Sequence, residues 1–182
     1  MINTRGMKIF AETERLLVRD WMEGDIAPFV AMNANEQVME FFLKKLSEQE
    51  SLAMLEIIRS EIRTSGFGFF AVERKEDNQF IGFVGLHNIT FDVDFAPAVE
   101  IAWRLLPSYW GKGYAVEAAK ACFVFAKENL GLKQIVAFTA LPNKNSQRVM
   151  QKLGMSFVKE FNHPLVPEHH FLQKHLLYRF FL

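Results

Sequence analysis

The chain has 182 residues, of which 50% are hydrophobic and 19 are phenylalanine. This length and composition predict one folded domain with a filled core and exclude a disordered chain or a coiled coil. The 21 basic and 21 acidic residues balance to a net charge of zero, which excludes a general electrostatic attraction to nucleic acid or to an anionic membrane.

The first half of the chain predicts a strand, two helices and a hairpin. The run RLLVRDW over 15–21 predicts the strand, and helical spacing of apolar residues predicts helices over 23–33 and 47–64. The stretch FGFFAVERKEDNQFIGFVGLHNI then predicts two strands joined by a polar turn at 74–79. No linker, repeat or low-complexity segment divides the chain, so we expect a single domain over 1–182.

The second half predicts alternating strands and helices. A strand over 98–106 leads into a helix over 113–129, and a strand over 133–140 leads into a helix over 144–153 that ends at Gly154. Two strands finish the chain, over 155–161 and 174–182. This order favours a mixed α/β sheet covered by helices.

The segment PSYWGKGYAVEAAKACFVFA, residues 107–126, places Gly111 and Gly113 directly before a helix. Glycine lets the backbone approach a ligand closely, and the first turn of a helix exposes N–H groups and a positive dipole end that suit a phosphate. Lys112 either adds a cation or is simply solvated. A tight turn explains the two glycines equally well, and the dinucleotide fingerprint is excluded because Val116 stands where its third glycine is required.

Two linked segments, RLLPSYWGKGYAVEAAKACF and then ALPNKNSQRVMQKLGMSF, resemble the GNAT superfamily of acyl-CoA-dependent N-acetyltransferases, in particular its RimJ/RimL-like branch that acetylates ribosomal proteins. The resemblance extends in weaker form to ETERLLVRDW and FIGFVGL, so it covers nearly the whole chain. It implies a GNAT fold, with a mixed, mostly antiparallel sheet of about six to seven strands, a central splayed parallel pair at 98–106 and 133–140, and about four flanking helices. It also implies acetyl-CoA as the acyl donor, an amine as the acceptor and no metal.

Carried over to this chain, the superfamily's phosphate loop falls on Trp110, Gly111, Lys112, Gly113, Tyr114 and Ala115. Trp110 replaces the glutamine or arginine of the superfamily but matches the RimJ/RimL-like form WGKGYA, and backbone N–H groups do most of the binding. By the same resemblance, Leu105 and Leu106 end the strand whose backbone holds the pantetheine arm and the thioester carbonyl. Asn143 and Ser146 match the family's N-x-x-S at the next helix start, beside the cofactor.

The reaction that the resemblance implies is attack of a neutral amine on a thioester, which needs a base and can use an acid. We take Glu100 as the base, because it lies on the strand before the loop in a position similar to that used by some superfamily members. Alternation along the strand places Glu100 on one face with Ala102 and Arg104. The alternative is that Glu100 merely pairs with Arg104 or another cation.

The acid is harder to assign, because Met150 stands where many superfamily members have a tyrosine and a thioether has no proton to donate. Ser146 is the nearest substitute; the alternatives are that its hydroxyl caps the helix or binds the cofactor, or that solvent protonates the departing thiolate. The missing tyrosine also motivates a function of another class, a non-catalytic acyl-CoA-binding sensor or interaction module.

Other reactive side chains have ordinary explanations. Cys122 lies on the apolar stripe of the helix over 113–129 and is expected in the core. His169 and His170 are adjacent, but the chain has neither an H-E-x-x-H pattern nor a cysteine partner for them, so no metal site is expected. By resemblance, the segment that carries these histidines borders the acceptor site.

The amino-terminal residues lack the apolar core of a signal peptide, and no later apolar run reaches the roughly 18 residues of a membrane span, so a cytoplasmic protein is expected. The single cysteine agrees with a reducing compartment. Met7 is a second candidate for the natural start. The expected partners are acetyl-CoA and an amine, either a protein N-terminus or a small molecule, and a homodimer is the habit of the family.

Overall fold

A computed structural model describes residues 6–182, which form an eight-stranded sheet with five α-helices and two 3-10 helices. The elements in chain order are β1 (Ile9–Glu12), β2 (Leu16–Arg19), η1 (Glu23–Asp25), α1 (Ile26–Ala34), α2 (Glu36–Met39), α3 (Glu48–Ser65), β3 (Phe69–Arg74), β4 (Gln79–Asn88), β5 (Val99–Leu105), η2 (Pro107–Tyr109), α4 (Tyr114–Leu130), β6 (Gln134–Ala140), α5 (Lys144–Lys152), β7 (Ser156–Asn162) and β8 (Lys174–Phe181).

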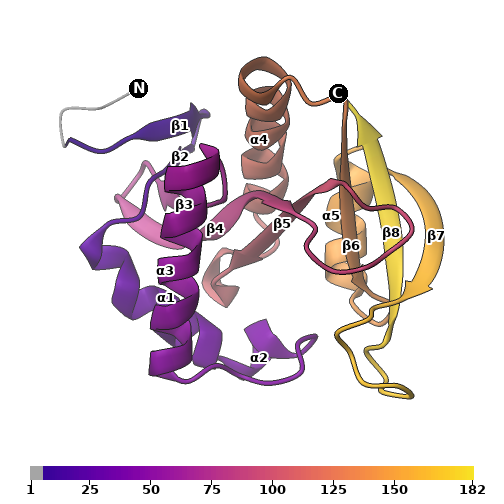
Figure 1. The fold of residues 1–182 in the computed structure, drawn as a ribbon. Helices are drawn as coiled ribbons and strands as arrows, with labels where there is room; N and C mark the ends of the chain where they lie inside the picture. The colour runs from indigo at the N-terminus through magenta and orange to yellow at the C-terminus, as the bar shows by residue number, and fades with distance from the viewer. Residues whose placement is uncertain (1–5) are drawn as a thin grey trace.

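The strands lie side by side in the order β1-β2-β3-β4-β5-β6-β8-β7 (Figure 1). Neighbouring strands are antiparallel except β5 and β6, which are parallel. The predicted mixed sheet with one central parallel pair is therefore confirmed. The expected number of strands and helices was too low, because β1 and α2 have only four residues each and are too short to show a hydrophobic period.

Helices cover both faces of the amino-terminal half of the sheet, as two consecutive residues of β3 show. The Phe70 ring stacks on Phe10 and meets the edge of Phe125 on α4. The neighbouring Phe69 points to the opposite face and contacts Phe83, which in turn contacts Phe29 on α1. The hydrophobic core thus lies in two layers, one beneath α4 and the other beneath α1 and α3 (Figure 1).

The helix predicted over 23–33 begins at Ile26, and residues 23–25 form a 3-10 turn instead. The turn is held by the Asp25 carboxylate, which accepts the backbone N–H of Met22 at 2.8 Å and bonds both Nη atoms of Arg19. Arg19 is only 2% exposed, and its Nε also donates to Glu73 at 2.8 Å. This buried ion cluster joins β2, η1 and β3. Its charged residues follow no hydrophobic period, so the sequence did not predict it.

The parallel pair β5 and β6 is held together at one register pair, Glu100 with Val136. By contrast, β5 pairs with β4 along its whole length, from Val99 with Asn88 to Leu105 with Gly82. The two parallel strands therefore separate toward their carboxyl ends, as Figure 1 shows. This separation is the predicted splay.

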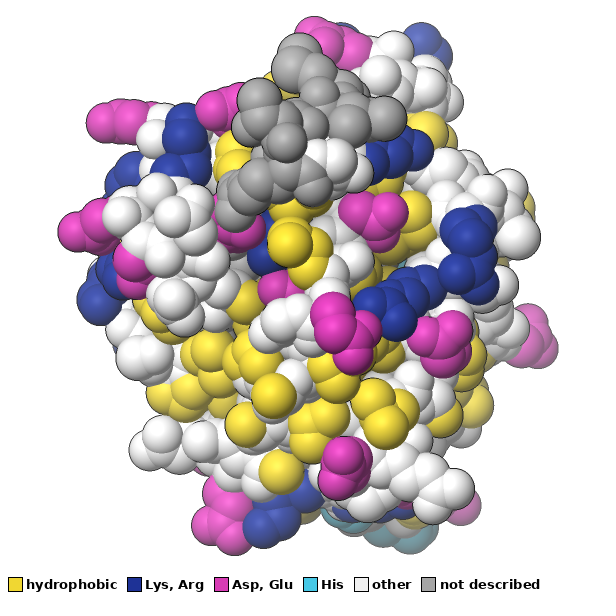
Figure 2. All heavy atoms as spheres, turned by 90° about the vertical axis from the view of Figure 1, so that its left-hand side faces the viewer, with side chains coloured by type: hydrophobic (Ala, Val, Ile, Leu, Met, Phe, Trp, Pro, Cys, Tyr) yellow, Lys and Arg dark blue, Asp and Glu magenta, His cyan; other side chains and the backbone are white. Residues whose placement is uncertain are grey.

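Charges of both signs are interspersed on the face that Figure 2 turns toward the viewer, the side on which β1, α1 and α3 lie in Figure 1. Hydrophobic side chains gather in the lower half of this face. No patch of one sign dominates it, in agreement with the zero net charge. Within residues 6–182, no helix has the length and apolar character needed to cross a bilayer.

Candidate active site

A cavity of about 710 Å³ lies where β5 and β6 separate. Its walls come from both faces of β5, from the segment around α2, from the starts of α4 and α5, and from the loop between β7 and β8. Of the predicted site residues, the cavity brings together Glu100, Leu105, Trp110, Gly111, Gly113, Tyr114, Ala115, Asn143 and Ser146. Leu106 and Lys112 do not line it.

The start of α4 opens into this cavity without a side-chain cap. Gly113 is the N-cap residue, and no side chain within residues 6–182 caps the first turn. Gly111 and Gly113 have φ angles of 73° and 82°, the left-handed region that glycine adopts without strain. A Cβ at Gly111 would meet no atom within 4 Å, so open space adjoins the loop. Free N–H groups, the positive dipole end and this space together fit a phosphate group.

A brace from the β1–β2 turn holds the loop in place, and the sequence did not reveal it. Arg15 Nη1 donates to the Lys112 carbonyl at 3.2 Å, and its Nε donates to Glu117 on α4 at 2.7 Å. Thr13 Oγ1 donates to the other Glu117 oxygen at 2.6 Å. Glu117 also complements the dipole in the first turn of α4. The packing of α4 against β1 and β2 brings residues so distant in the chain together.

The backbone of β5 offers hydrogen-bonding groups to the splay, at positions that differ in part from the prediction. Leu106 N–H donates to the Ile81 carbonyl of β4 at 2.9 Å, so it is not free for a cofactor. Because pairing alternates along an antiparallel strand, Trp103 and Leu105 instead turn their backbone groups toward β6. Leu105 C=O already accepts the Trp110 indole N–H at 2.8 Å, which ties the phosphate loop to the strand. Trp103, which also lines the cavity, was missed as a site residue.

Glu100 lies half-buried on the cavity wall, and its side chain has no hydrogen bond or ion pair among the described residues. Burial raises the pKa of its carboxyl to about 7, the charge of His87 opposes this shift, and the charge of Glu61 adds to it. The alternative in which Glu100 pairs with Arg104 is not what the structure has. Arg104 Nη1 donates to Asn33 Oδ1 at 2.6 Å instead. A carboxyl that titrates near neutral pH, without a partner, is suited to accept a proton.

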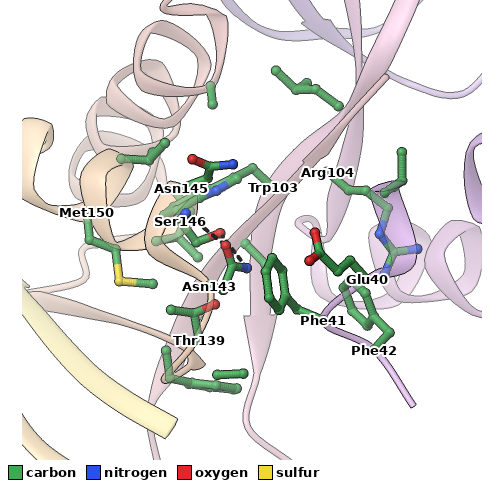
Figure 3. Close-up of a pocket in the computed structure, with 18 of the residues that line it drawn as sticks. Glu40, Phe41, Phe42, Trp103, Arg104, Thr139, Asn143, Asn145, Ser146 and Met150 are labelled. Carbon is green, nitrogen blue, oxygen red and sulfur yellow. Dashed lines mark hydrogen bonds between the residues drawn. The ribbon is translucent and has the colours of Figure 1, made fainter. Parts of the chain in front are cut away.

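The start of α5 closes the other side of the cavity (Figure 3). Asn143 caps the helix by accepting the Ser146 N–H at 3.1 Å, and its amide group donates to Ser146 Oγ at 3.2 Å. Ser146 is therefore not the cap, and its hydroxyl proton has no acceptor among the described residues. Met150, which is 1% exposed, lines the same wall one turn further on.

Two of the histidines border the cavity, whereas the adjacent pair His169 and His170 does not line it. His163 and His175 have ring centroids 4.8 Å apart and both line the cavity. Burial lowers the pKa of both, that of His163 to about 4 with a contribution from His175, so burial favours the neutral form of both rings. His169 is exposed. Within residues 6–182, no group of three His, Cys, Asp or Glu side chains is arranged to hold a metal ion.

Comparisons with known proteins agree with this geometry. The uncharacterized N-acetyltransferase YoaA of Bacillus subtilis is 26% identical over 151 residues, 82% of each chain. A GNAT-family acetyltransferase structure from Bacillus anthracis has a TM-score of 0.78 at 24% identity and covers 94% of this chain and 97% of its own. Mycobacterium smegmatis RimJ, solved with CoA-disulfide, has a TM-score of 0.73 at 17% identity, over 96% of this chain and 85% of its own. At these identities the two structures show a shared fold.

The model of the acetyltransferase (GNAT) domain family matches residues 15–156. The match begins at the Arg15 brace, runs through the phosphate loop and continues beyond Met150 on α5. It covers well over half of the chain and includes both strands of the splay. The chain therefore belongs to the GNAT family of N-acetyltransferases.

Proposed function

We propose that the protein transfers the acetyl group of acetyl-CoA to a primary amine by direct attack within a ternary complex, without a covalent enzyme intermediate. The observation that carries this proposal is Glu100, a carboxyl with a pKa of about 7 and no partner among the described residues. It lines the same cavity as the uncapped start of α4. A proton acceptor and an anion site thus share one space.

The residues around the cavity fit acetyl-CoA. The N–H groups of the first turn of α4 would bind its pyrophosphate, with Gly111 and Gly113 leaving room for it. Lys112 is exposed beside the loop and would add a cation at its edge. Asn143 and Ser146 would flank the pantetheine arm, opposite the backbone groups of β5 that face the splay. When bound, acetyl-CoA supplies an activated carbonyl and a thiolate leaving group.

Two side chains, those of Glu100 and Ser146, would transfer the protons. Glu100 would take the proton from the attacking amine, directly or through a water molecule. The Ser146 hydroxyl has an unused proton and would donate it toward the departing sulfur. Met150 offers no proton, although it lies beside Ser146 (Figure 3). The N–H groups of Trp103 and Leu105 face the gap and are suited to donate to the thioester carbonyl.

The acceptor class is a primary amine, either the N-terminal α-amine of a protein or a small molecule. The likeness in fold to RimJ supports the first option and the RimJ/RimL-like assignment of the phosphate loop. The zero net charge, which gives no attraction to ribosomes, supports the second. We further infer a cytoplasmic location and, from the habit of the family, a homodimer.

The test is calorimetric titration of the purified protein with acetyl-CoA, followed by release of free thiol in the presence of amines. We expect binding in the micromolar range. Gly113→Glu should abolish it, because it adds a negative charge where the phosphates bind. Gly131→Glu is the matched control, because Gly131 also has a positive φ but lies at the other end of the same helix. Equal affinity in both variants would exclude a phosphate site at the start of α4.

A second candidate function is that of a non-catalytic acyl-CoA-binding module. It is favoured by one observation, the buried Met150 on the cavity wall where a tyrosine acid would stand. Glu100→Gln separates the two functions. If the wild type releases thiol and the variant binds acetyl-CoA equally well but does not, the protein is an enzyme that uses Glu100. If the wild type binds acetyl-CoA and no amine releases thiol, the module is the better description.

A further inference from the structure

We propose that the acceptor is an amine that also carries a carboxylate, of the amino-acid class, and that Arg104 binds this carboxylate. The inference rests on the proposed acetyl transfer and specifies its second substrate. It is carried by a guanidinium group that lines the cavity and has no acidic partner among the described residues.

Arg104 is half-buried on β5 and is held rigidly. Its Nη1 donates to Asn33 of α1 at 2.6 Å, and its guanidinium carbon lies 4.3 Å from the Phe42 ring centroid and 5.2 Å from that of Phe83. Its Nε is buried and has no hydrogen-bond partner in the described part of the chain. Leaving a cation in such surroundings without an anion is costly, whereas a bound carboxylate would remove that cost through charge-assisted hydrogen bonds.

The position of Arg104 relative to Glu100 sets the size of the acceptor. Both side chains project from the same face of β5, with Ala102 between them, and all three line the cavity. At about 3.3 Å per residue, Ala102 lies roughly 6.6 Å along the strand from each of them. An amine above the small Ala102 side chain is thus within reach of Glu100 while a carboxylate a few bonds away reaches Arg104. An amino acid seated over Ala102 would present its amine toward Glu100 and its carboxylate toward Arg104.

The surrounding walls favour an apolar body for this acceptor. Phe41, Phe42, Phe83, Met54 and Phe138 all line the cavity. In Figure 3 the Phe42 ring lies beside Arg104, so an apolar side chain would have contact surface next to the bound carboxylate. Apolar α-amino acids therefore match the walls as well as the charge.

The same arrangement disfavours the other amine classes. A polyamine would bring a second cation toward Arg104, and a protein N-terminus presents a neutral peptide carbonyl in place of the carboxylate. Glu40 also lines the cavity on this side, but it is exposed and forms no ion pair with Arg104 within residues 6–182. It leaves the guanidinium free for a ligand.

The experiment compares leucine, methionine and phenylalanine with their amides, and with spermidine and a short peptide, in the thiol-release assay. We expect the wild type to use the acids with a kcat/KM at least about tenfold higher than that of the amides, since the amide replaces the carboxylate that Arg104 would bind with a neutral group. Arg104→Gln should lower kcat/KM for the acids by about the same factor and leave the amides and the Kd for acetyl-CoA unchanged. Arg63→Gln, an exposed arginine on α3, is the control and should change neither.

A second readout does not depend on turnover. In calorimetry with CoA present, N-acetyl-leucine should bind the wild type at least about tenfold more tightly than N-acetyl-leucinamide, and Arg104→Gln should abolish the difference. Arg104→Lys, which keeps the charge, should retain part of it and covers the case in which the glutamine variant does not fold. Equal use of acids and amides, or a preference for spermidine or the peptide, would overturn the inference and leave acetyl transfer intact. Failure to release thiol with any amine would overturn both.

Discussion

Glu100 on β5 lies directly opposite His87 on β4, and the His87 Nδ1 atom is 2.8 Å from Glu61 Oε1 on α3. The hydrogen bond with Glu61 raises the pKa of His87 although burial opposes it. The positive charge of the protonated His87 imidazole lowers the pKa of the proposed base, against the burial that raises it. The pairing of β4 with β5 therefore positions the proposed base and also affects its pKa.

The first prediction concerns this pairing. Since Glu100 must be ionised to accept a proton, kcat/KM of the wild type should rise with pH through about 7. His87→Asn removes the positive charge that lowers the Glu100 pKa, so the rise should move to higher pH. The measurement is the pH profile of thiol release. His169→Asn, which alters an exposed histidine, should leave the profile unchanged, and a downward shift in His87→Asn would contradict this account.

Stability should depend on the same carboxyl. The pKa of Glu100 is about 7 in the folded state, whereas the ordinary pKa of a solvated glutamate is 4.5, so ionisation disfavours folding. The cost is absent below pH 4.5, grows with pH and is complete above about 7. Glu100→Gln removes it, and the Tm of the variant should exceed that of the wild type by several degrees at pH 8 and by much less at pH 5, since 1 kcal/mol corresponds to about 2–4 °C for a chain of this size.

Thermal melts by circular dichroism at the two pH values would measure this difference. Glu128→Gln is the matched control, because Glu128 is exposed on α4 and should give the same small change at both. A Glu100→Gln protein that is less stable at pH 8 than at pH 5, relative to the wild type, would mean that the ionised carboxylate has a partner in solution.

Ser146→Ala tests the proposed acid. We expect kcat to fall about tenfold or more with little change in the affinity for acetyl-CoA, because the hydroxyl proton is the one lost while the Asn143 cap stays in place. Ser47→Ala removes the serine cap of α3 instead; it should cost about 1 kcal/mol of stability and leave kcat unchanged. If Ser146→Ala retains the full kcat, solvent must protonate the sulfur.

Gly85 on β4 should tolerate no side chain. A Cβ there would lie 2.0 Å from the Gly68 carbonyl oxygen and 2.7 Å from the Phe69 Cα. Both are backbone atoms at the start of the neighbouring strand β3, and they cannot move aside without breaking the β3–β4 pairing. Gly85→Ala should therefore unfold the protein or lower its Tm by more than about 10 °C, on the scale of about 2–4 °C per kcal/mol. Gly24→Ala meets no atom within 4 Å and should melt close to the wild type.

The sequence by itself determined the order of the elements from β2 onward, the mixed sheet and the glycine-containing loop before α4. These depend on local signals: the apolar spacing of α3 and α4, the polar turn before β4, and glycines at positive φ before a helix. The strand and the helix that the sequence did not predict, β1 and α2, have four residues each and show no hydrophobic period.

The tertiary structure alone decided which groups meet. The Arg15 brace on Glu117, the His87–Glu61 pair behind Glu100 and the Asn33 contact of Arg104 each join residues at least 26 positions apart, through sheet pairing and helix packing. The sequence did not show that the Leu106 N–H bonds the Ile81 carbonyl of β4, whereas the backbone groups of Trp103 face β6, because the direction of a backbone N–H depends on the hydrogen-bonded register with β4. The pKa of Glu100 likewise depends on burial, a property of the folded chain that no local pattern carries.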